Sequence, residues 1–111
     1  MPRRLYRHDM RQPMPLGSRG VARPSRFRNP FDWRTSGSRA VCVALFVEEY
    51  AQDEAYRARV VQALRGKDLW CYCRLCPRHG AGKPWDEDCR DCAPCHADVL
   101  LRWANEPARS P

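Results

Sequence analysis

The sequence has no long apolar run and no apolar N-terminal segment of the kind that directs export. Nothing in its 111 residues approaches the roughly 18 apolar residues of a membrane-spanning helix. It also lacks the G-x-S-x-G and H-E-x-x-H motifs, and the glycines at 80 and 82 lack the spacing of a phosphate-binding loop. We therefore expect a cytoplasmic protein that does not associate with membranes.

Acidic residues are scarce in the first third of the chain. Residues 1–34 hold nine arginines and only two acidic residues, Asp9 and Asp32, so this segment carries 9 − 2 = +7, which equals the net charge of the whole chain. Prolines and aromatic residues lie between the arginines. Arginine donates paired hydrogen bonds to phosphate, and aromatic rings can stack on bases. The segment predicts either a nucleic-acid or nucleotide partner or a solubilising basic tail, and we expect residues 1–20 to form a basic arm.

Cysteines, in contrast, are concentrated in one segment. Six of the seven cysteines and two of the three histidines lie between residues 71 and 96. This density and the short C-x-x-C and C-x-x-H spacings are typical of zinc sites. The odd number of cysteines and the expected reducing location argue against disulfides. Two sets of ligands are compatible with the spacing: Cys76, His79, Cys89 and Cys92, or Cys73, Cys76, Cys92 and Cys95. The first set leaves Cys71, Cys73, Cys95 and His96, enough for a second tetrahedral site.

Local patterns predict three helices and one strand. Apolar residues recur at helical spacing over residues 39–52 and 53–65, and Ser38 and Asp53 are the expected N-caps. Residues 67–73 alternate like a strand, and a last helix should run from about residue 95 to 105. Because side chains two apart share a face of a strand, Cys71 and Cys73 should point the same way. The N-terminus of the last helix should bring Cys95 and His96 to the same edge and favour a thiolate on Cys95.

Several motifs, in order, resemble a known family. They are VARPSRFRNPF at 21–31, LRGKDL at 64–69 leading into CYC at 71–73, CHADVL at 95–100, and AN at 104–105. Over residues 3–105 they resemble the small bacterial and phage proteins known as domain of unknown function 4326. The resemblance implies a small Rossmann-like α/β domain over residues 21–106, followed by a tail at 107–111. Arg28 stands where the family usually has glycine.

The resemblance also bears on the choice of zinc ligands. Shorter family members join the C-x-C and C-H motifs by only a few residues, so residues 74–94 are an insertion in this chain. It contains Cys76, His79, Cys89 and Cys92, which the resemblance therefore favours as one Zn²⁺ set. The expected architecture is a single α/β domain with a zinc-binding loop insertion and a basic N-terminal arm.

Three classes of function follow from these features. The first is a zinc-binding domain that binds a nucleotide or nucleic acid, and the second is a small enzyme acting on a nucleotide, nucleoside or modified base. The third is a zinc-stapled protein-interaction module. For the enzyme, Cys73 or Cys95 would be the nucleophile and His96 the acid or base. We expect one cleft to collect these three residues, Cys71 and the turn that contains Asn29 and Phe31. We also expect Arg23, Arg26 and Arg28 of the basic segment to contact phosphates of the ligand.

Overall fold

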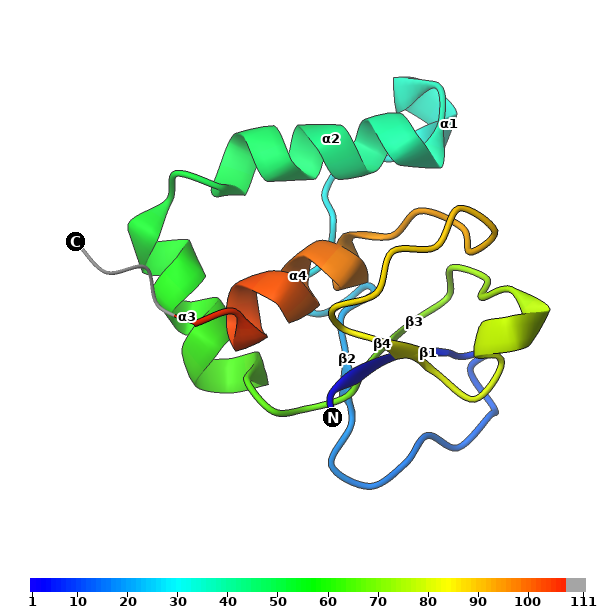
Figure 1. The fold of residues 1–111 in the computed structure, drawn as a ribbon. Coiled ribbons are helices and arrows are strands. Elements are labelled where there is room, and N and C mark those ends of the chain that lie inside the picture. The colour runs from blue at the N-terminus through cyan, green and yellow to red at the C-terminus, as the bar shows by residue number, and fades with distance from the viewer. Residues whose placement is uncertain (108–111) are drawn as a thin grey trace.

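The computed structural model describes residues 1–107, so most of the expected tail lies outside the described part of the chain. Each of the four α-helices has a side-chain N-cap. The side chains of Asp32, Ser38, Asp53 and Cys95 accept hydrogen bonds from backbone amides at the helix starts. Figure 1 shows their arrangement. The helices are α1 (Trp33–Ser36), α2 (Arg39–Tyr50), α3 (Glu54–Leu64) and α4 (His96–Asn105), with a short 3₁₀ helix, η1, at Pro77–His79.

Four short strands form one mixed sheet in the order β2-β3-β1-β4. They are β1 (Arg3–Tyr6), β2 (Arg19–Gly20), β3 (Leu69–Cys71) and β4 (Lys83–Pro84). Strands β1 and β2 run parallel to β3, whereas β4 is antiparallel to β1. The chain is therefore a small mixed α/β domain. Tyr6 pairs with Cys71, so β1 and β3 end together where the cysteine-rich segment begins.

The position of β1 differs from the expectation of a basic arm outside the domain. Residues 3–6 lie between β3 and β4 inside the sheet. Arg4 is fully buried there, and its guanidinium donates to Asp98 Oδ2 (2.8 Å) and to the carbonyls of Cys73 (3.2 Å), Arg74 (3.3 Å) and Ala93 (2.8 Å). A buried charge is stable when it is paired and hydrogen-bonded. Arg4 thus ties the first strand to both ends of the cysteine-rich segment and to α4.

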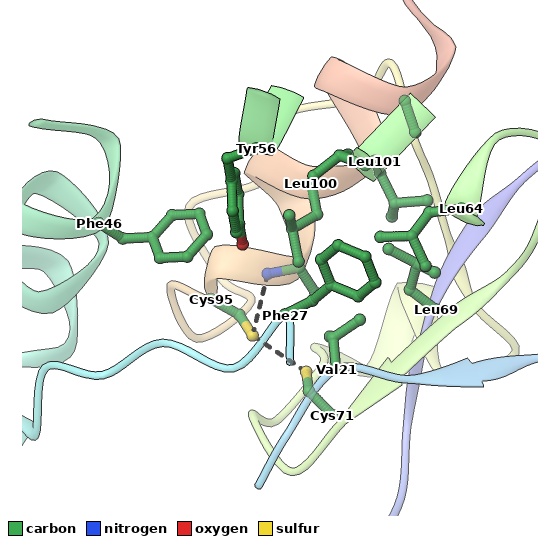
Figure 2. Packing of buried hydrophobic residues seen from close by; sticks show 13 residues of the cluster. Val21, Phe27, Phe46, Tyr56, Leu64, Leu69, Cys71, Cys95, Leu100 and Leu101 are labelled. Atoms are coloured by element: carbon green, nitrogen blue, oxygen red, sulfur yellow. Dashed lines mark hydrogen bonds between the residues drawn. The ribbon is translucent and has the colours of Figure 1, made fainter. Parts of the chain in front are cut away.

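The main core lies between the sheet and the helices, with α4 at its centre (Figure 1). Helix α4 packs against α2, α3, β1 and β3. Figure 2 shows the buried side chains, among them Phe46, Leu64 and Leu100, with Cys71 and Cys95 at one end of the cluster. A separate, smaller cluster of Leu75, Cys76 and Cys92 lies in the cysteine-rich segment. No helix within residues 1–107 combines the length and apolar character needed to cross a membrane.

Candidate metal centre and adjoining cleft

Four side chains of residues 74–94, the expected insertion, meet around one point. The ligand atoms of Cys76, His79, Cys89 and Cys92 all lie within 4.8 Å of one another and could hold a metal ion. The Sγ atoms of Cys76 and Cys89 are 3.7 Å apart, and His79 Nδ1 lies 3.2 Å from Cys76 Sγ and 3.5 Å from Cys92 Sγ. Tetrahedral zinc with ordinary bond lengths requires about 3.8 Å between sulfurs and about 3.6 Å between sulfur and nitrogen. The donor set therefore fits a tetrahedral ion.

Neighbouring groups orient these ligands. His79 Nε2 lies 3.1 Å from Glu87 Oε2, which leaves Nδ1 free to face the sulfurs. A carboxylate behind a histidine is the common outer shell of a zinc ligand. The Cys76 amide donates to Cys92 Sγ (3.2 Å), and Arg78 approaches Cys89 Sγ (3.6 Å). Burial alone would raise the pKa of Cys89, but the backbone amides of Asp91 and Cys92 and the Arg78 guanidinium lower it to about 6. The environment of Cys89 therefore favours the thiolate that a metal requires, whereas burial raises the pKa of Cys92 to about 11.

Three of the four remaining cysteines form a second cluster at the end of the main core. Cys71, Cys73 and Cys95 place their sulfurs within 4.8 Å of one another, so the structure groups Cys73 and Cys95 with Cys71 and not with Cys76 and Cys92. The Cys71 and Cys95 sulfurs are 3.0 Å apart and face each other in Figure 2. His96 Nδ1 is 3.8 Å from Cys95 Sγ, but the imidazole is not a member of the three-sulfur group.

Hydrogen bonds set the charge state of this cluster. The pKa of Cys73 is lowered to about 2 because Cys71 and Cys95 donate to its sulfur and Arg4 and Arg39 lie nearby. The pKa of Cys95 is raised well above its ordinary value, chiefly because its thiol hydrogen-bonds Cys71. The thiolate is therefore on Cys73 and not on Cys95, although Cys95 caps a helix. Burial lowers the pKa of His96, whose Nε2 faces the Val21 carbonyl (2.9 Å), so the ring is neutral and Nε2 carries the proton.

A cavity of about 150 Å³ opens beside this second cluster. Its lining includes Asn29, Phe31, Cys73, Cys95 and His96, which the sequence analysis assigned to the cleft, and the expected phosphate contact Arg23. Cys71 lies behind the wall, in contact with Cys95. Arg26, the other arginine expected to contact phosphate, lies outside this cavity, beside Phe27, Tyr56 and Arg59. Asn29 uses its amide to position the loop, since it donates to the Cys42 carbonyl (3.0 Å) and accepts from the Phe31 amide (2.9 Å).

The cavity wall also contains Arg28, which the sequence analysis expected to contact phosphate, and three residues that it did not assign, Arg39, Trp33 and Cys42. Arg28 stands where the family resemblance led us to expect glycine. Within residues 1–107 only glycines have positive φ, so the backbone at Arg28 does not require glycine. Arg39 follows Ser38 in the first turn of α2, and its guanidinium reaches Cys73 Sγ (3.5 Å) and lies 5.7 Å from the centre of the Trp33 ring. The position of Arg39 next to the N-cap residue Ser38 was the one sequence feature that could have indicated its place in the cavity wall.

A family model described as Domain of unknown function (DUF4326) matches residues 5–106. The chain belongs to this family. The DUF4326 match begins in β1 and ends after α4, so it includes both cysteine clusters and the cavity. No curated protein and no solved structure matches the chain.

Proposed function

We propose that this DUF4326 protein is a zinc-stapled domain that binds a nucleotide or nucleic acid in the cavity beside Cys73 and His96. Zinc would be held by Cys76, His79, Cys89 and Cys92. The spacing of these four donors carries the zinc assignment. All four ligand atoms lie within 4.8 Å of one another, and the 3.2, 3.5 and 3.7 Å distances are within about 0.4 Å of those of tetrahedral zinc. Three parallel strands with a helical crossover between β2 and β3 support a Rossmann-like core as part of the same proposal.

The charge of the cavity supports the phosphate-bearing ligand. Arg23, Arg28 and Arg39 line it, and none of them forms an ion pair with a carboxylate in the part of the chain that is described. The aromatic rings of Phe31 and Trp33 lie in the same wall, and 46% of Trp33 is exposed. Free guanidinium groups bind phosphate, and exposed aromatic rings stack on bases. A volume of about 150 Å³ is small for a ligand site. The cavity therefore suits one base or one phosphate group, with the rest of the ligand along the surface.

The test is a salt series with a fluorescein-labelled single-stranded oligonucleotide, read by fluorescence anisotropy. Replacing Arg28 and Arg39 with alanine should weaken binding and reduce the slope of log K against log salt by about 0.7, since the cavity suits one phosphate group and each neutralised phosphate contributes about 0.7. The matched control is Arg26→Ala with Arg59→Ala, which removes the same charge outside the cavity. Equal losses in the two double variants, or no binding by the unsubstituted protein, would contradict the proposal.

A small enzyme acting on a nucleotide, nucleoside or modified base is the second candidate. The observation in its favour is the low pKa of Cys73, a thiolate in the cavity wall close to a neutral His96. Turnover of a nucleoside or nucleotide that disappears in Cys73→Ser and persists in Cys42→Ser would support it. Turnover unaffected by Cys73→Ser would exclude this nucleophile.

A further inference from the structure

The three-sulfur cluster at the cavity wall has no part in the zinc site of the insertion. Its members come from two distant segments: Cys71 ends β3, Cys73 follows two residues later, and Cys95 caps α4. Cys71 and Cys95 are almost fully buried, whereas Cys73 is partly exposed in the cavity. All seven cysteines of the chain are free thiols in the structure. Three thiols gathered this closely need a chemical reason, because ordinary packing would be served by one small apolar residue at each position.

We propose that Cys71, Cys73 and Cys95 bind a second zinc ion whose fourth coordination position is open to the cavity. The three sulfurs lie within 4.8 Å of one another, and a zinc ion with three thiolates requires about 3.8 to 4.0 Å between them. The 3.0 Å between Cys71 and Cys95 is shorter than that and far longer than the roughly 2.05 Å of a disulfide. Metal entry would push these two sulfurs apart by less than 1 Å.

The surrounding charges suit such an ion. Arg4 and Lys83 have side chains that are 0% and 4% exposed, and both pair with the single carboxylate of Asp98, at 2.8 and 3.1 Å. The two cations and one anion leave one buried positive charge. A divalent ion with three thiolates carries one negative charge, the same charge as the metal-free cluster with one thiolate on Cys73, so metal binding keeps the sum of the buried charges at zero. Buried charges are stable when they are compensated in this way.

The fourth position follows from what surrounds the sulfurs. The His96 ring lies close to Cys95 but outside the three-sulfur group, and its Nε2 proton is held by the Val21 carbonyl. Cys73 and Cys95 both line the cavity, which brings one side of the cluster to a space that a water molecule or a ligand atom can enter. Zinc sites with three protein ligands and one exchangeable ligand are characteristic of binding and reactive centres, whereas closed sites are structural. In this arrangement Cys73 is a ligand and not a nucleophile.

Metal content measured by native mass spectrometry tests the second ion without any nucleic acid, so the result is independent of the proposed ligand. The unsubstituted protein, purified without chelator, should carry two zinc ions per chain. Cys73→Ser should carry one, and so should Cys89→Ser. Cys42→Ser removes another buried cysteine of the cavity wall and should retain two. One zinc in the unsubstituted protein that persists in Cys73→Ser, or a Cys71–Cys95 disulfide, would overturn the proposal.

Cobalt substitution tests the open position. In a Cys76→Ser, Cys89→Ser double variant, cobalt bound at the second site should give visible bands of tetrahedral thiolate coordination, and added imidazole should shift them. The closed site that remains in Cys73→Ser should not respond to imidazole. His96→Gln should still bind two zinc ions. Loss of one ion in that variant would make His96 the fourth ligand and contradict the open position.

Discussion

Replacing Arg4 tests most clearly whether residues 3–6 form a strand inside the sheet or belong to a basic arm outside the domain. Its fully buried guanidinium makes four hydrogen bonds of 2.8–3.3 Å that reach three backbone carbonyls and Asp98. Hydrogen bonds to a charged group contribute about 1.5–3 kcal/mol each, but water can reach some of the freed carbonyls after substitution. Asp98 would also keep its contact with Lys83. We therefore expect Arg4→Met to lower the free energy of unfolding by about 4 kcal/mol, within the range for breaking a buried ion pair.

Urea unfolding of the zinc-loaded protein, followed by circular dichroism, measures this loss. The neighbouring Arg3→Met is the matched control, because its side chain is 44% exposed and its 3.8 Å contact with Asp68 should contribute less than about 1 kcal/mol. Arg4→Lys keeps the charge but cannot reach four acceptors, so it should fall between the two and provide a measurable variant if Arg4→Met does not fold. Equal stability of the Arg3 and Arg4 variants would refute the placement of β1 inside the sheet.

Three further predictions concern the sheet and the zinc loop. A Cβ atom at Gly20 would overlap the Trp70 ring, so Gly20→Ala should lower stability by about 1–3 kcal/mol, whereas Gly80→Ala, which meets no close atom, should have little effect in the same urea assay. Glu87→Gln should weaken zinc affinity about 10- to 100-fold in a competition with a chromophoric chelator, because it weakens the contact that orients His79. The control Asp86→Asn should leave the affinity unchanged. Equal affinities of the two variants would argue against the Glu87 contact. Chelation of the insertion's zinc should raise hydrogen exchange in residues 74–94 and leave α2 and α3 protected, and loss of protection throughout would show that the metal holds the whole fold.

Helices α2, α3 and α4 were predictable because their signals are local, whereas the single turn of α1 was not predicted. Ser38 and Asp53 cap α2 and α3 as their sequence positions predict, and Gly66 adopts the expected positive φ after α3. Strand β1 was not predictable by the same means. Its four residues include two arginines, and hydrophobic periodicity cannot distinguish a buried arginine from an exposed one. Its burial depends on Asp98, 94 residues away, and on carbonyls of the cysteine-rich segment.

The candidate site was predictable where the spacing of cysteines and histidines along the chain indicates metal ligands. The spacing of the cysteines and histidines allowed two four-ligand sets, and the family resemblance favoured Cys76, His79, Cys89 and Cys92, which the structure brings together. The strand and helix signals predicted that Cys71, Cys73, Cys95 and His96 lie at one edge. The location of the thiolate was not predictable, because the helix N-terminus favours Cys95 whereas hydrogen bonds from two buried thiols favour Cys73. The separation of Arg26 from Arg28 depends on the turn that buries Phe27, which no local pattern reveals.

The most direct test of the zinc-stapled domain is an anomalous difference map from crystals of the protein, measured at the zinc absorption edge. We predict a peak about 2.3 Å from the sulfurs of Cys76, Cys89 and Cys92 and about 2.0 Å from His79 Nδ1. A map without a peak among these four residues, or density joining the Cys76 and Cys89 sulfurs as a disulfide, would contradict the account.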